Sequence, residues 1–371
     1  MKTLHIERSF AQVSVVHSTF FYSSVSTARA ITRLMLSFAL TIIFMVALFA
    51  LRPLQSFSQS EQLKTKYPVV MVHGILGFDT LFKNFPRGTK GFDYFYNIAD
   101  TLSEQGTTIY FATTPSSSSN AQLGEALLRQ IREILLKEGT TKVHLIGHSQ
   151  GGLAARYVLS HAPEVLASIT TIASPHMGAA IPDLILSDRI NQSPFLKSIV
   201  FKLFDLMGLT LEKLSGNQNP QNSAGALYDL SSTGAAAYNQ KYPAGLPPRW
   251  ESDPCDLEGI QHTYQGVHLY SWNAIRPYDF HNFLDQPDYL LYWGSHIFTF
   301  MNNRDGEQND GLVGKCSMYF GEVINAQPYI QNHAEEINLS VRSILGLPPA
   351  AGRTDPIPLY ISHIKRLQAI E

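Results

Sequence analysis

The stretch that decides the fold is VHLIGHSQGGLAARYVLS, residues 143–160. It starts with an apolar run typical of a buried strand, and residues 153–159 have the composition of a closely packed helix. Between the two, Gly147, Ser149 and Gly151 fit the pattern G-x-S-x-G. In that pattern the serine lies on a sharp strand-to-helix turn that lifts its hydroxyl clear of the sheet. The flanking strand and helix favour this interpretation over an ordinary turn with a surface serine.

A serine hydroxyl is a poor nucleophile without a base beside it, so Ser149 predicts a histidine elsewhere in the chain. On a fold with this turn, the acid and then the base follow the serine along the sequence. The segment NDGLVG offers Asp310 as the acid, and QNHAEEINL offers His333 as the base. Both lie in predicted loops near the C-terminus. Spacing alone leaves other candidates open, namely His268, His281, His296 and Asp279.

The chemistry of acyl transfer needs two hydrogen-bond donors for the oxyanion of its tetrahedral intermediates. The first strong predicted strand, YPVVMVH (residues 67–73), leads into the turn HGILGFD (residues 73–79). Sites in open α/β sheets lie beyond the carboxyl ends of the strands, which is where this turn falls. We expect the backbone N–H groups of Ile75 and Gln150 to be the donors. The alternative for the turn is an ordinary strand ending.

From Tyr67 onward, predicted strands and helices alternate. Further strands are expected at residues 108–113, 142–147 and 168–174, and helices at residues 94–105 and 121–139. The second of these helices has leucine and isoleucine at helical spacing, which indicates one buried face. This rhythm predicts an α/β fold with a mostly parallel, doubly wound sheet and helices on both of its faces.

Composition narrows the class of protein further. The chain has 371 residues, 44% of them hydrophobic, and a formal net charge of −2. The lysines and arginines are scattered, which argues against a nucleic-acid partner. The uncharged apolar run at residues 34–51 predicts either a secretory signal or a signal anchor in the inner membrane. We expect residues 1–58 to be this N-terminal segment and residues 59–371 to be one globular domain, secreted through the periplasm.

The state of the cysteines depends on that export. The only cysteines, Cys255 and Cys316, suit one disulfide in an exported protein or two free thiols in a cytosolic one.

A separate feature is an apolar segment, residues 194–214, whose hydrophobic positions recur every three or four residues. We expect it to be a mobile lid within an insertion at about residues 180–216. A permanently packed core helix would have the same periodicity.

Together these motifs resemble a known family. The segments are YPVVMVHGILGFD, LIGHSQGG, SWN, NFLDQPD, NDGLVGKCS and NHAEEIN, spread over residues 64–370. As a set they resemble the secreted, foldase-dependent triacylglycerol lipases of Gram-negative bacteria, whose fold is the α/β-hydrolase fold. The resemblance implies a lid-covered lipase with Ser149 as nucleophile, Asp310 as acid and His333 as base. It also supports Ile75 and Gln150 as oxyanion donors, a Cys255–Cys316 disulfide and a periplasmic foldase partner.

The resemblance also implies a structural calcium ion. Asp285 matches one carboxylate ligand, whereas the second position, usually Asp, is Glu335 in this chain. The remaining ligands would be the backbone carbonyls of Leu339 and Ser343. The alternative for Glu335 is a solvated acidic pair with its neighbour Glu336, placed at a helix N-terminus where negative charge is favourable.

Three functions remain in competition on these residues. A lipase would hydrolyse long-chain acylglycerols through an acyl-enzyme intermediate. A carboxylesterase for short soluble esters would use the same triad and lack an apolar lid. A non-catalytic binding module would need a broken triad, and Ser149 with its ordered partners argues for acyl transfer.

Overall fold

A computed structural model describes residues 62–83, 91–187, 194–248, 256–276, 308–325 and 327–371. The predicted N-terminal segment, including the apolar run at residues 34–51, lies outside these residues, as do Cys255, Asp279 and Asp285. Among the described residues, no helix is long and apolar enough to cross a membrane. The side chains of residues 194–196 are also not described.

The centre of the molecule is a seven-stranded sheet with the order β10-β8-β6-β5-β1-β4, and β7 pairs with β8. All of its pairings are parallel except the one between β7 and β8. The strands are β1 (Val69–Val72), β4 (Ile109–Phe111), β5 (Val143–His148), β6 (Leu166–Ile172), β7 (Thr263–Tyr264), β8 (Val267–Trp272) and β10 (Glu322–Val323). The predicted mostly parallel sheet is therefore confirmed, with β1 and β4 shorter than predicted and β5 and β6 shifted by one or two residues.

Helices cover both faces of this sheet, because alternate side chains of each strand point to opposite sides. On one face Val70 and Val72 pack with α3 (Asn120–Glu138) and α4 (Gln150–His161). On the other face Val69 and Met71 pack with α2 (Ile98–Glu104) and α12 (Pro356–Gln368). Two apolar layers thus enclose the sheet, and the doubly wound arrangement is confirmed.

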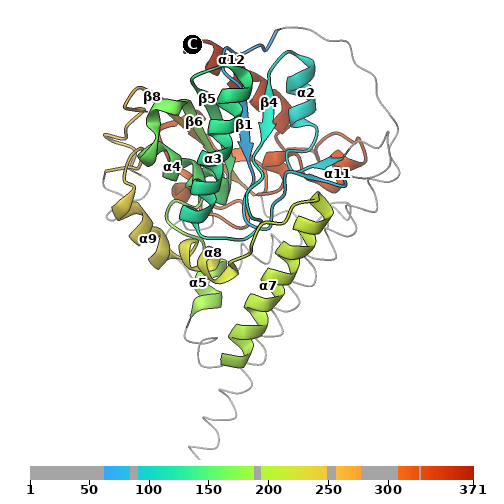
Figure 1. Ribbon diagram of the computed structural model, residues 1–371, viewed down its shortest axis with the longest axis vertical. Coiled ribbons are helices and arrows are strands. Elements are labelled where there is room, and N and C mark those ends of the chain that lie inside the picture. The colour runs from blue at the N-terminus through green and yellow to red at the C-terminus, as the bar shows by residue number, and fades with distance from the viewer. Residues whose placement is uncertain (1–61, 84–90, 188–193, 249–255, 277–307, 326) are drawn as a thin grey trace, which may run out of the picture.

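The remaining elements lie around the carboxyl ends of the parallel strands or flank the sheet. Figure 1 shows α7 running away from the sheet along the long axis of the molecule. The helices are α5 (Ala180–Leu186), α7 (Pro194–Ser215), α8 (Ser223–Asp229), α9 (Ser232–Lys241) and α11 (Val341–Ile344), with short 3-10 turns at Pro163–Val165, Lys315–Met318 and Glu335–Ile337. Two small sheets pair β2 (Thr80–Leu81) with β3 (Phe92–Asp93), and β9 (Ala274–Ile275) with β11 (Tyr329–Ile330).

Candidate active site

Ser149 lies at the turn between β5 and α4, as its sequence pattern predicts. Its backbone has φ 54° and ψ −127°, a conformation that L-residues rarely adopt. The glycines on either side are required by close approach of the chain to itself. A β-carbon at Gly147 would lie 2.6 Å from the carbonyl carbon of Gly151, and one at Gly151 would lie 2.3 Å from the carbonyl oxygen of Val72. The turn is therefore packed against β1, beside the end of that strand.

The loops that carry Asp310 and His333 meet. Nδ1 of His333 lies 2.6 Å from Oδ2 of Asp310, and the backbone N–H of His333 donates to the carbonyl oxygen of Asp310 at 3.0 Å. The other carboxylate oxygen, Oδ1, accepts the backbone N–H groups of Leu312 and Val313 at 2.8 and 2.7 Å. Asp310 is fully buried. Its carboxylate is thus fixed in one orientation by three hydrogen bonds, and the backbone bond from His333 holds the two loops together.

This arrangement selects one tautomer of His333. A carboxylate can only accept, so Nδ1 of His333 donates its proton to Asp310 and Nε2 is left as the basic nitrogen. The His333 ring lies beside the strand-to-helix turn, with its centroid 4.5 Å from that of His148, the residue before Ser149. The structure therefore brings the predicted acid and base together and places the base next to the predicted nucleophile's turn.

A second chain of hydrogen bonds, which sequence patterns did not predict, passes through His148. Its Nε2 lies 3.0 Å from the carbonyl oxygen of His333 and must be the donor there. Burial, and after it the charge of His333, lowers the pKa of His148 well below 6.5, so the ring is neutral. Nδ1 therefore accepts a hydrogen bond from the hydroxyl group of Tyr94 at 2.9 Å. The Tyr94 oxygen in turn accepts the backbone N–H of Gly74 at 3.3 Å.

The predicted oxyanion donors lie on either side of Ser149. Gly74 approaches the nucleophile so closely that a β-carbon there would lie 2.6 Å from the β-carbon of Ser149. Ile75 follows Gly74 directly, and Gln150 is the first residue of α4, where backbone N–H groups lack helical acceptors. Within the described part of the chain, neither the Ile75 nor the Gln150 N–H donates a hydrogen bond. Both are available to a ligand.

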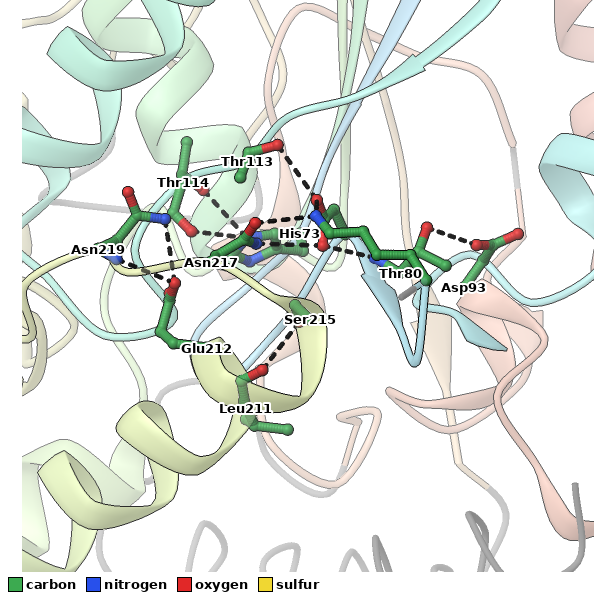
Figure 2. Close-up of polar contacts among 12 residues, drawn as sticks. His73, Thr80, Asp93, Thr113, Thr114, Leu211, Glu212, Ser215, Asn217 and Asn219 are labelled. Atoms are coloured by element: carbon green, nitrogen blue, oxygen red, sulfur yellow. Dashed lines mark hydrogen bonds and ion pairs between the residues drawn. The ribbon is translucent and has the colours of Figure 1, made fainter. Parts of the chain in front are cut away.

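The turn that carries Ile75 is held from outside by the C-terminal end of α7. The Leu76 N–H donates to the Ser116 carbonyl at 2.6 Å, and the Ser116 N–H donates to Glu212 Oε1 at 2.9 Å. Oε2 of Glu212 accepts the backbone and side-chain N–H groups of Asn219 at 3.2 and 3.1 Å, as Figure 2 shows. Glu212 is only 3% exposed. Its buried carboxylate thus connects α7 to the oxyanion turn.

Polar contacts of the following segment strengthen this junction (Figure 2). Lys83 donates to Asp79 and to Asn217, both at 2.8 Å, and Asn217 also donates to Asp79 at 3.2 Å. The backbone N–H of Phe82 donates to the Leu214 carbonyl at 2.8 Å. These contacts fix the last turn of α7 against the small β2–β3 sheet.

Away from this junction, α7 presents apolar side chains to solvent. Ile199, Leu206 and Leu209 are 42%, 60% and 46% exposed. On the same helix Val200 and Phe204 are buried in the main apolar cluster. The helix is therefore apolar over a wider arc than its buried face needs, as the sequence predicts.

The calcium site that the resemblance implies is only partly within the described residues, because Asp285 lies outside them. Glu335 is in the expected loop, two residues after His333. Its Oε2 atom lies 3.3 Å from Nη1 of Arg353 and accepts the backbone N–H of Asn332 at 2.8 Å. The guanidinium of Arg353 therefore lies beside the carboxylate that the resemblance implies as a calcium ligand.

One of the two expected carbonyl ligands already accepts a hydrogen bond within the fold. The Ser343 carbonyl accepts the N–H of Gly346 at 3.1 Å, at the end of α11. Among the described residues, no group of three or more His, Cys, Asp or Glu side chains could hold a metal. Calcium takes six to eight oxygen ligands, and the described residues hold only part of the implied set, since Asp285 lies outside them. The acidic pair is not solvated either, because Glu336 is fully buried.

Of the other predicted residues, His268 lies far from the nucleophile. It pairs with Ser168 in the register of β8 and β6, whereas His148 pairs with Ile172 at the opposite end of β6. His281, His296, Asp279 and Cys255 fall outside the described residues. Cys316 is 1% exposed, and the described part of the chain contains no free cysteine.

Comparison with known proteins agrees with this geometry. Residues 67–326 match the family model of the alpha/beta hydrolase fold, so the chain belongs to the α/β-hydrolase fold family. The crystal structure of Staphylococcus hyicus lipase shares the fold with a TM-score of 0.54 and 18% identity, covering 85% of this chain and 98% of that one.

Sequence comparison narrows the class to bacterial lipases. A triacylglycerol lipase of Vibrio cholerae is 34% identical, covering 88% of this chain and 95% of the relative. Triacylglycerol lipases of Pseudomonas fragi and Burkholderia plantarii are 33% and 35% identical, covering 83% and 82% of this chain and 98% and 86% of the relatives. The predicted resemblance to triacylglycerol lipases of Gram-negative bacteria is thereby confirmed. The chain is an enzyme of the carboxylic ester hydrolase class.

Proposed function

We propose that this lipase hydrolyses long-chain acylglycerols through a covalent acyl-enzyme on Ser149, with His333 as base and Asp310 as the acid that orients it. The observation that carries the proposal is the 2.6 Å contact between His333 Nδ1 and Asp310 Oδ2. That contact leaves Nε2 of His333 basic, beside the turn that carries a strained, buried serine.

In the first half of the reaction, Nε2 of His333 takes the Ser149 hydroxyl proton as Oγ attacks the ester carbonyl carbon. The N–H groups of Ile75 and Gln150 stabilise the resulting oxyanion. His333 then gives the proton to the departing alcohol, and the acyl group remains on Ser149. In the second half, water attacks the acyl-enzyme with His333 again as base, and the fatty acid leaves. Asp310 stabilises the imidazolium in both halves.

Covalent labelling tests the assignment of the nucleophile. An organophosphate ester that phosphorylates activated serines should inactivate the enzyme with one phosphoryl group per chain. Peptide mass spectrometry should place that group on Ser149, and Ser149→Ala should remain unlabelled. His333→Ala keeps Ser149 and should be labelled far more slowly, because the base is missing. Labelling at another serine would exclude the proposed mechanism.

The proposal includes α7 as a lid. Its exposed apolar side chains would bind an oil surface, and its C-terminal end, held by Glu212, would serve as the fixed end during movement. An oil surface shifts a lid only if it binds one lid conformation better than the other. The exposed leucines of α7 would give the open conformation that advantage, because they can contact the oil. A soluble ester has no such surface, so opening on an emulsion distinguishes a lipase from an esterase.

Export completes the proposal. Residues 1–58 direct the chain across the inner membrane, either as a cleaved signal or as an anchor, and a periplasmic foldase assists the folding of residues 59–371. A Cys255–Cys316 disulfide would then close a loop beside the acid, since Cys316 lies in the short helix Lys315–Met318 soon after Asp310. The absence of a free thiol at Cys316 supports this pairing.

A further inference from the structure

The loop that carries the base is held by a buried ion pair at the position where the resemblance implies calcium. We propose that the guanidinium of Arg353 replaces that ion and holds the His333 loop through Glu335, making Arg353 a positioning residue. This inference rests on the proposed role of His333 as the base. In this proposal Arg353 supplies the positive charge that a bound metal ion would otherwise supply.

The first support is the geometry of the loop. Glu335 Oε2 accepts the backbone N–H of Asn332 at 2.8 Å, while Asn332 Oδ1 accepts the N–H groups of Ala334 and Glu335 at 3.0 and 2.9 Å. These reciprocal bonds enclose His333 between the two residues that make them. The conformation of the base loop therefore depends on where the Glu335 carboxylate lies.

The second support is the burial of the pair. Arg353 Nη1 lies 3.3 Å from Glu335 Oε2, and the two side chains are only 5% and 11% exposed. A carboxylate with so little access to water is stabilised by a nearby positive charge, and removal of one member of a buried ion pair is strongly destabilising. An arginine side chain stays charged at every ordinary pH. Unlike a bound calcium ion, it cannot dissociate from the protein.

The third support is the rigidity of the segment that carries Arg353. The N–H of Thr354 donates to the carbonyl of Ile330 at 2.9 Å, and the N–H of Ile330 donates to Thr354 Oγ1 at 3.0 Å. Gln331 Nε2 also donates to the Thr354 carbonyl, at 3.2 Å. Arg353 is thus fixed alongside the end of β11, immediately before the His333 loop, and its guanidinium is pre-positioned for Glu335.

A calcium ion would compete directly with this arrangement. It would have to bind the same carboxylate that faces the guanidinium, and two positive charges beside one buried carboxylate repel each other. The native enzyme should therefore bind no calcium here. Removal of the guanidinium should open the position, so that calcium acts on the variant and not on the native chain.

The experiment compares the native enzyme with Arg353→Ala, Arg353→Lys and Glu335→Gln, each in excess EDTA and in millimolar calcium. The measurements are melting temperature, kcat and KM on a soluble p-nitrophenyl ester, and calcium binding by isothermal titration calorimetry. The matched control is Arg129→Ala, which removes an ion pair with Glu125 that is 62% and 64% exposed. Exposed pairs contribute little, so this control should behave as the native enzyme.

The native enzyme should bind no calcium and should keep its melting temperature and kcat in EDTA. In EDTA, Arg353→Ala should lower kcat by about 10- to 100-fold, as small displacements of a catalytic group do. Calcium should restore much of that loss, and Arg353→Lys should lie between the two. Glu335→Gln should lose activity in EDTA and remain unresponsive to calcium.

Three results would overturn the inference: calcium binding by the native enzyme, loss of its stability in EDTA, or an Arg353→Ala variant that is fully active in EDTA or insensitive to calcium. Calcium binding and melting temperature do not depend on catalysis. A failed triad would be recognised separately, by Ser149→Ala retaining activity while these calcium measurements come out as expected.

Discussion

The hydroxyl of Tyr94 lies 2.9 Å from Nδ1 of His148, and this contact joins the two halves of the candidate active site. On one side Tyr94 accepts the N–H of Gly74, which precedes the oxyanion donor Ile75. On the other side His148 donates to the carbonyl of His333. Burial raises the pKa of Tyr94, so its hydroxyl keeps the proton that it donates. Movement of either loop is therefore opposed by the other.

Tyr94→Phe should lower kcat on a soluble ester by roughly 5- to 100-fold, because buried groups left without a partner cost about 1–3 kcal/mol. KM should change much less, since the Tyr94 hydroxyl contacts Gly74 and His148 and not the ester. Steady-state kinetics on p-nitrophenyl butyrate measures both. Tyr110→Phe is the control, because the Tyr110 hydroxyl bonds Glu138 at the exposed surface. An unchanged kcat in Tyr94→Phe would show that the connection has no catalytic role.

The double variant Leu206→Ser, Leu209→Ser should separate emulsified from soluble substrates. Both leucines are exposed on α7, so the fold should tolerate the change while the helix loses affinity for an oil surface. Titration of fatty acid from emulsified triolein should fall several-fold, and hydrolysis of dissolved tributyrin should stay near the native rate. Leu136→Ser is the matched control, an 85% exposed leucine on α3. Equal losses on both substrates would contradict a moving lid.

The acid stability of the enzyme should depend on a buried histidine of α12. His363 is fully buried with Nε2 2.6 Å from Thr170 Oγ1, and burial is the main cause that lowers its pKa from 6.5 to about 3. As pH falls below 6.5, the unfolded chain binds a proton that the native state refuses. The contribution of the neutral His363 to the free energy of unfolding is therefore complete above that pH. It is lost at about 1.4 kcal/mol per pH unit as pH falls toward the native pKa.

His363→Gln removes this titration and keeps an amide donor for Thr170. The free energy of unfolding, measured by urea denaturation at several pH values below 6.5, should fall less steeply with acid in the variant than in the native enzyme. The difference between the two slopes should approach that of one proton. Parallel slopes would mean that His363 is protonated in the native state.

Local pattern was enough to predict the sheet and the nucleophile turn. Residues 69–72 are a continuous apolar run and residues 143–147 are mostly apolar, which is typical of parallel strands buried on both faces, and G-x-S-x-G fixes the turn between β5 and α4. Chain order alone left several acids and histidines open, and the family resemblance selected Asp310 and His333, whose loops the structure brings together. The sheet and the turn could be predicted because each depends on neighbours in sequence.

The contacts that support the site could not be predicted, because they join distant segments without any spacing rule. Tyr94 lies in an aromatic run that looks like ordinary core, and its role depends on reaching His148. Glu212 follows helical apolar residues and would be expected at the surface, yet five donors surround its buried carboxylate. Arg353 lies in a Pro- and Gly-rich stretch, and its pairing with Glu335 depends on the β11 contacts.

The most direct test of the account is fatty-acid release from a chain-length series, tributyrin to triolein, by the native enzyme, Ser149→Ala and His333→Ala. The native enzyme should hydrolyse the series and remain active on triolein above its solubility. Each variant should keep the native melting temperature and lose activity on every member by a factor on the order of 10⁴ or more, as triad removal does. His333→Ala with near-native rates, or native enzyme confined to dissolved tributyrin, would contradict a lipase that works through this triad.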